Sequence, residues 1–124
     1  MRLSSNDFTK LVREALKGIP PRFARYLEDV AVDVEPMPDR QTCEELGLED
    51  PTELFGLYQG TPLTERSVEQ PIELPDRIIL YQRNIESVCD CREDVIEEVR
   101  TTVLHEIGHH FGLDENDLEE LGYD

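Results

Sequence analysis

Three residues near the carboxyl end of the chain have types and a spacing that could bind a metal ion. His105 and His109 are four residues apart, so on an α-helix they lie on one face, about 6 Å apart along the axis. This arrangement suits two ligands of one tetrahedral zinc ion. Glu106 points about 100° around the helix, beside the metal and within reach of a water on it. The pattern is HExxH, and it predicts Glu106 as a general base.

A third ligand would have to come from the short segment after His109. On a continuous helix, Glu115 would lie about 9 Å beyond His109 along the axis, too far to share one ion. Gly112 can end the helix in the left-handed conformation, so that the chain turns back and brings Asp114 or Glu115 to the metal. Aspartate would need a tighter turn than the longer glutamate. We therefore expect Glu115 as the third ligand, with Asp114 as the alternative.

The extended pattern HExxHxxGxxE, which ends at Glu115, resembles the zincin metallopeptidases and among them the small bacterial mini-zincins. Residues 54–66 and 74–81 also look like the middle section of that family, so the resemblance covers roughly residues 52–121. The family pattern usually has aspartate at the position of Glu115. The resemblance implies a zinc-dependent peptidase whose metal ligands are the two histidines of the pattern and this glutamate.

The resemblance also implies how such a peptidase would work. Zinc would activate a water molecule, and Glu106 would take its proton during attack on a peptide carbonyl. A sheet edge beside the metal would bind an extended peptide or protein substrate, and which strand forms that edge is open. The donor that stabilises the developing oxyanion is also open, since four residues are candidates by type alone: Tyr58, Tyr81, Tyr123 and His110.

A non-catalytic alternative uses the same residues. In a metal-binding or protein-interaction module, the ligands would only attach the C-terminal tail to the helix. Four protein ligands would favour this structural role, whereas three ligands and an open position would favour hydrolysis. His110 faces about 100° away from His109, and we expect it to be an exposed helix residue rather than a ligand.

The composition and charge of the chain argue against some classes of binding partner. The chain has 29 acidic and 12 basic residues, a net charge of −17, which argues against a nucleic-acid-binding protein. We find no apolar run long enough for a signal peptide or a membrane span, so we expect a cytoplasmic protein without a membrane partner. The length suits one domain, residues 1–124, and leaves the oligomeric state open. The three cysteines are expected to be free thiols: Cys43, Cys89 and Cys91.

Helical periodicity predicts two helices in the N-terminal part. Apolar residues recur at helical spacing over residues 8–16, behind Ser4, and Gly18 ends the run. Pro21 is placed to begin a shorter helix that reaches Leu27. Both helices are expected to pack on the core.

The long last helix carries the metal-site pattern on its final turns. Asp90 and Glu93 resemble a capping pair at its start. An apolar stripe is expected to face the core and consists of Ile96, Val99, Val103 and Ile107.

Three segments have strand character: 30–34, 54–59 and 77–83. Residues 35–53 are expected to be a mobile loop with one helical turn near Cys43 to Leu46, and residues 60–76 a long connection that borders a substrate cleft. We therefore predict an α+β zincin-like domain. Its three-stranded sheet, mainly antiparallel or mixed, would pack on the C-terminal metal-binding helix and the N-terminal helices.

Overall fold

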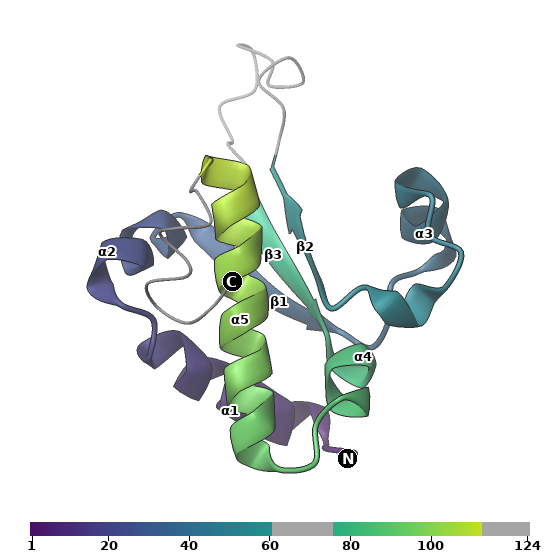
Figure 1. Ribbon diagram of the computed structural model, residues 1–124, viewed down its shortest axis with the longest axis horizontal. Coiled ribbons are helices and arrows are strands. Elements are labelled where there is room, and N and C mark those ends of the chain that lie inside the picture. The colour runs from purple at the N-terminus through teal and green to yellow at the C-terminus, as the bar shows by residue number, and fades with distance from the viewer. Residues whose placement is uncertain (61–75, 113–124) are drawn as a thin grey trace.

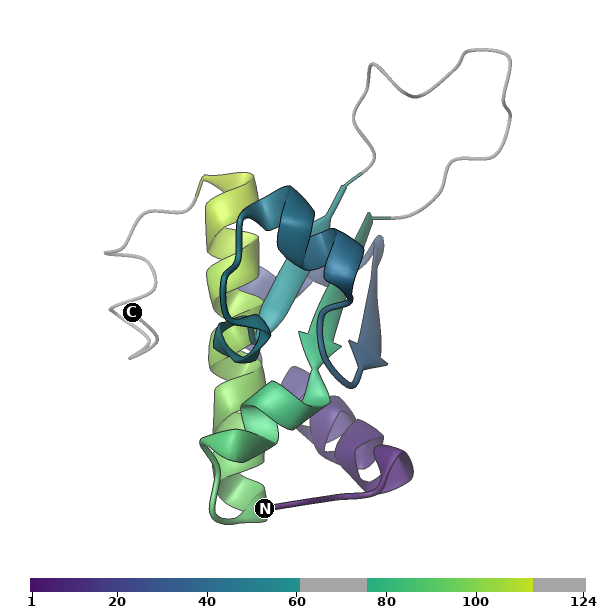
Figure 2. The same cartoon turned by 90° about the vertical axis from the view of Figure 1, so that its right-hand side faces the viewer.

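The computed structural model describes residues 1–60 and 76–112 (Figure 1). The long helix α5 crosses a three-stranded sheet, and α1 packs against the N-terminal half of α5 (Figures 1 and 2). In chain order the elements are α1 (Ser5–Lys17), α2 (Pro21–Ala24), η1 (Arg25–Leu27), β1 (Val30–Glu35), α3 (Arg40–Leu46), η2 (Pro51–Glu53), β2 (Gly56–Gln59), β3 (Asp76–Tyr81), α4 (Gln82–Ser87) and α5 (Arg92–Phe111). The predicted α+β class is confirmed.

The sheet is mixed, with the strand order β1-β3-β2. The central strand β3 pairs in parallel with β1 and antiparallel with β2. Residues 78–81 of β3 are all buried, which explains their continuous apolar run, because a central strand covered on both faces has no solvent side. The predicted strand 77–83 is too long at its end, since Gln82 and Arg83 already belong to α4.

The N-terminal helix α1 has the predicted ends. The Ser4 hydroxyl accepts a hydrogen bond from the Asp7 N–H at 3.1 Å, and Gly18 is the C-cap. The buried face of α1 packs on α5 and the sheet, so it forms one wall of the core. Its buried residues are Phe8, Leu11, Val12 and Ala15.

Residues 35–53 contain more helix than predicted, because α3 extends the expected turn near Cys43 to Leu46 back to Arg40, and η2 follows it. The Asp39 carboxylate accepts from the Thr42 N–H at 2.7 Å at the start of α3. Gly47 ends the helix in the left-handed conformation with φ 68°. No residue of α3 is fully buried, so its apolar periodicity is weak and its caps are the stronger signal.

The short helix α4 anchors the segment that leads into β2. Asn84 is 2% exposed, and its side-chain amide donates to the backbone oxygens of Pro51 and Leu54, both at 2.7 Å. A buried polar side chain with satisfied hydrogen bonds specifies one arrangement of the chain. This contact therefore fixes the position from which β2 starts.

Helix α5 begins differently from the prediction. Its N-cap is Cys91, which makes no side-chain cap hydrogen bond, whereas the Asp90 N–H donates to the Asp94 carboxylate at 3.0 Å. The predicted pair of Asp90 and Glu93 is therefore wrong. The core-facing stripe is confirmed from Val99 onward, although Ile96 is only partly buried. All three cysteines are free thiols. Within the described residues, we found no helix long and apolar enough to cross a membrane.

Candidate metal centre

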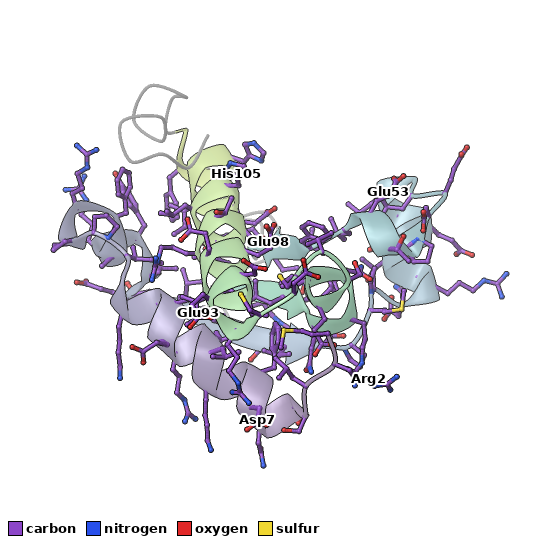
Figure 3. All side chains as sticks on the ribbon, turned by 60° about the horizontal axis from the view of Figure 1, so that its bottom comes forward. Arg2, Asp7, Glu53, Glu93, Glu98 and His105 are labelled. Atoms are coloured by element: carbon purple, nitrogen blue, oxygen red, sulfur yellow. The ribbon has the colours of Figure 1, made fainter. Side chains whose placement is uncertain are left out.

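The two histidines of the pattern lie on the last turns of α5. Their ring centroids are 6.4 Å apart and the ring planes differ by 21°. Two imidazoles on one tetrahedral zinc ion would have centroids about 5 Å apart, so side-chain rotations that move the rings by about 1 Å bring this pair to ligand distance. His105 is half-buried and His109 is exposed. His105 and Glu98 point to the same side of α5 (Figure 3). The imidazoles of His105 and His109 therefore fit as two ligands of one zinc ion.

The third ligand falls outside the described residues, as do both of its candidates, Asp114 and Glu115. Within residues 1–60 and 76–112, no group of three or more potential metal ligands occurs. Gly112, however, ends α5 with φ 68° and ψ 28°. This is the left-handed conformation that the sequence predicted, and a chain in this conformation leaves the helix direction at once.

Glu106 is directed at strand β2 rather than at solvent. Its Oε2 accepts a hydrogen bond from the Tyr58 N–H at 3.2 Å. Burial raises the pKa of Glu106, while the Tyr58 N–H, His109 and His105 act in the opposite direction. A half-buried carboxylate with a raised pKa accepts a proton more readily than an ordinary glutamate does.

The contact between Glu106 and Tyr58 is one of three that repeat along α5 and β2. One turn before it, a Cβ built on Gly56 would lie 2.6 Å from Thr102 Cγ2. One turn after it, a Cβ built on Gly60 would lie 3.3 Å from His110 Cε1, and the His110 ring also stacks on the Tyr58 ring with centroids 3.8 Å apart. Four helix residues rise about 6.0 Å and two strand residues about 6.6 Å, so the two elements stay in register over this length. Gly56 allows the close approach because it has no side chain.

The Tyr58 side chain ties this end of β2 to β3. Its hydroxyl donates to Asp76 Oδ2 at 2.8 Å, and His110 Nε2 lies 4.0 Å from the same oxygen. Burial, and secondly the hydrogen bond to Asp76, raise the pKa of the Tyr58 hydroxyl. We call Tyr58, Asp76 and His110 the tyrosine cluster. The phenol of this cluster is engaged by a carboxylate and stays protonated.

The four candidates for the oxyanion donor lie in different parts of the chain, and two of them lie near Glu106. Tyr58 and His110 lie beside Glu106. Tyr81 is buried at the opposite end of β3 from Asp76, and burial raises its pKa to about 12. Tyr123 lies outside the described residues. Sequence reasoning missed Asp76 and the Tyr58 N–H, because a backbone donor has no sequence signal and Asp76 is 18 residues from its partner.

Aromatic rings support the C-terminal turn of α5. The Phe111 side chain is 41% exposed, but its ring centroid lies 4.8 Å from that of Tyr26 in η1 and 6.0 Å from that of Tyr58. The turn that carries His109 is therefore held from two sides, by η1 and by β2. This reduces the freedom of the histidine face.

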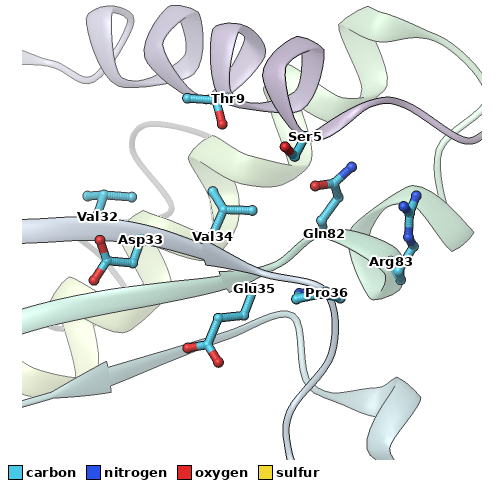
Figure 4. Close-up of a pocket in the computed structure, with 9 residues that line it drawn as sticks. All are labelled: Ser5, Thr9, Val32, Asp33, Val34, Glu35, Pro36, Gln82 and Arg83. Carbon is cyan, nitrogen blue, oxygen red and sulfur yellow. The ribbon is translucent and has the colours of Figure 1, made fainter.

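A cavity of about 350 Å³ lies elsewhere, between α1, β1 and the start of α4 (Figure 4). Val32 and Val34 face the hydroxyl-bearing residues Ser5 and Thr9 across it (Figure 4). The Gln82 amide at one end already donates to Leu3 O at 3.0 Å. The cavity is lined by none of the residues of the HExxH pattern or the tyrosine cluster.

Comparison with known proteins gives a family and a fold. A family model described as "zincin-like metallopeptidase" matches residues 27–123, well over half of the chain. A solved structure of a conserved hypothetical protein from Thermus thermophilus is similar, with a TM-score of 0.55 and 29% sequence identity. The match covers 88% of this chain and 94% of that one. No curated protein matches the chain. The extent of the family match shows that the chain belongs to the zincin-like metallopeptidases.

Proposed function

We propose that this chain is a zinc-dependent peptidase in which Glu106 is the general base. The observation that carries the proposal is the placement of Glu106 between the face of the two histidines and the edge of β2. Burying part of a carboxylate costs free energy, which its one hydrogen bond from the Tyr58 N–H only partly offsets. A purely structural metal site would not need this non-ligand acid, so the placement favours hydrolysis over a metal-binding or protein-interaction module.

We assign the metal ligands as His105, His109 and Glu115, with Asp114 as the alternative to Glu115. Bound there, zinc supplies Lewis acidity toward a water molecule and a peptide carbonyl. Glu106 accepts the proton of the attacking water and passes it to the leaving amine.

The substrate is a peptide or protein segment that lies extended along β2. Within the described residues, β2 pairs only with β3, so its other edge offers backbone groups beside Glu106. Backbone pairing at a sheet edge holds an extended peptide with little dependence on its sequence. The Tyr58 N–H is one of these groups.

Metal binding is tested first, by elemental analysis. Protein purified without chelators and offered zinc should hold about one zinc ion per chain. Glu115→Ala should weaken zinc binding by at least about 100-fold, and Asp114→Ala much less. A protein that stays metal-free would remove the basis of the proposal, and parent-like affinity in Glu115→Ala would exclude that residue as a ligand.

Catalysis is tested with Glu106→Gln, which keeps the shape of the side chain and removes the base. Parent and variant are compared on a mixed peptide library, with cleavage followed by mass spectrometry. Hydrolysis should fall by at least about 100-fold while the zinc content stays the same. A chelator control removes background from contaminating metallopeptidases. Equal cleavage by both proteins would assign the activity elsewhere, and no cleavage by the zinc-loaded parent would favour the interaction module.

A further inference from the structure

The Tyr58 N–H has two competing uses if β2 binds substrate. We propose that a bound peptide displaces Glu106 from the Tyr58 N–H. In the free protein this N–H donates to the carboxylate of Glu106, and in the complex it donates to a carbonyl of the peptide. This inference rests on the proposed function, because it assumes that peptides dock on the β2 edge. It adds that peptide binding itself releases the base.

The direction of the Tyr58 N–H supports this competition. The carbonyl of Phe55 accepts from the Tyr81 N–H at 2.9 Å, so the backbone groups of Phe55 point toward β3. Backbone groups of an antiparallel edge strand point alternately toward and away from the neighbouring strand. Tyr58 is three residues further along, so its N–H points away from β3. Its acceptor on that side is the carboxylate of Glu106.

A docked strand needs the same hydrogen. A peptide added to β2 takes up the outward backbone groups of every second residue, which are those of Gly56 and Tyr58. An N–H carries one hydrogen and makes one good hydrogen bond. The N–O distance to Glu106 is 3.2 Å, at the long end of the normal range. Such a bond is replaceable by a well-aligned carbonyl.

The surrounding contacts confine the change to the Glu106 side chain. Thr102 packs against Gly56 one turn before it, and the His110 ring stacks on Tyr58 one turn after it. The Tyr58 hydroxyl is held by Asp76. Helix and strand are thus joined on both sides of the exchanged bond, so α5 and β2 keep their spacing when the carboxylate leaves.

The test compares two zinc-loaded variants that both lack the base and have the same charge. Glu106→Gln keeps an oxygen that accepts from the Tyr58 N–H, whereas Glu106→Ala has no acceptor. The probe is the neutral capped peptide acetyl-Ala-Leu-Ala-Leu-Ala-amide, titrated into ¹⁵N-labelled protein. The alanine variant should bind it roughly three- to tenfold more tightly than the glutamine variant, the gain expected from one hydrogen bond that need not be broken. Without peptide, the Tyr58 amide should exchange with solvent faster in Glu106→Ala.

A matched pair of second substitutions checks which donor is involved. In the Glu106→Ala background, Tyr58→Ala keeps the N–H and should retain tight binding, whereas Tyr58→Pro removes it and should lose the gain. Proline is tolerated where the N–H of an edge strand faces outward, and circular dichroism of both variants is the check that they fold.

The outcomes separate this inference from the proposed function. Equal peptide affinities of Glu106→Gln and Glu106→Ala would overturn the shared donor even if the parent hydrolyses peptides. An unchanged Tyr58 amide signal in both titrations would overturn it as well. Tighter binding by Glu106→Ala together with an inactive parent would support the shared donor and overturn hydrolysis alone.

Discussion

The two outer strands of the sheet make different side-chain contacts. At β1, Asp33 and Glu35 form ion pairs with Arg77 on β3, at 3.1 Å and 3.3 Å. At β2, the neighbouring surface is α5, which lies so close at Gly56 that a single Cβ would collide with Thr102. Charged side chains at an edge discourage its pairing with other chains, whereas α5 contacts the side-chain face of β2.

The difference shows where chemistry can be placed. The ion pairs at β1 connect neighbouring strands and leave their backbone groups unaffected. The contact at β2 directs a carboxylate at a backbone N–H. Only the second arrangement links the edge on which we propose that a peptide docks to the side chain that we propose as the general base. Four substitutions test this contrast.

The largest effect should come from Gly56→Ala, because the new Cβ would lie 2.6 Å from Thr102 Cγ2 and 3.3 Å from Ile79 O. Overpacking of this kind costs about 1–3 kcal/mol of the free energy of unfolding, measured by urea denaturation. Adding Thr102→Ser removes the colliding methyl group and should restore much of the loss. If the double variant is no more stable than Gly56→Ala, the close approach of α5 is not the reason for this glycine.

Tyr58→Phe should have the next largest effect, because it removes the part-buried hydrogen bond from the Tyr58 hydroxyl to the Asp76 carboxylate. We expect a loss of about 1–2 kcal/mol in the free energy of unfolding. Tyr26→Phe is the matched control, since the Tyr26 hydroxyl has an exposed partner, Arg25. Equal losses for the two variants would contradict a special role of the tyrosine cluster.

Arg77→Gln tests the other edge. The Arg77, Asp33 and Glu35 side chains are 38%, 50% and 40% exposed, so their ion pairs should contribute less than about 1 kcal/mol. Peptide hydrolysis per zinc should be the same as in the parent. A strong loss of activity with retained stability would show that the β1 edge also takes part in function.

The smallest effect concerns pH. Burial raises the pKa of Glu106 in the folded state, so the folded protein binds a proton more readily than the unfolded chain. This contribution to stability is present below the ordinary glutamate pKa and is lost as the pH rises through the folded-state pKa. In metal-free protein, Glu106→Gln should therefore gain in Tm relative to the parent between pH 4 and pH 7. A difference that is constant with pH would contradict the assigned cause.

Local signals predicted much of the fold. The caps of α1 and the left-handed Gly112 are set by residues within a few positions of each other, as is the helical spacing of His105 and His109. The caps of α3 are equally local, so that helix could have been predicted from Asp39 and Gly47. Helix α4 could not, because its buried residues include the polar Gln82, Asn84 and Glu86, the reverse of an amphipathic pattern.

The site was predictable only in part, for a physical reason. The HExxH pattern predicts which helix residues could bind metal, since that depends on one element. The partner of Glu106 lies 48 residues away in the sequence, and its identity depends on how β2 and α5 are placed against each other. No periodicity within either segment contains that information, although the spacing of Gly56 and Tyr58 matches the spacing of Thr102 and Glu106 once both are seen together.

That matched spacing limits how the chain can change length during evolution. One residue inserted between Thr102 and Glu106 would turn the carboxylate about 100° away from β2. One inserted between Gly56 and Tyr58 would direct the tyrosine N–H toward β3. Four helix residues are also about 0.6 Å shorter than two strand residues. This difference adds up with each further pair of contacts, so α5 and β2 cannot stay aligned over many more residues. Insertions and deletions should therefore be absent from these two short intervals in functional relatives, even where the segments on either side vary in length.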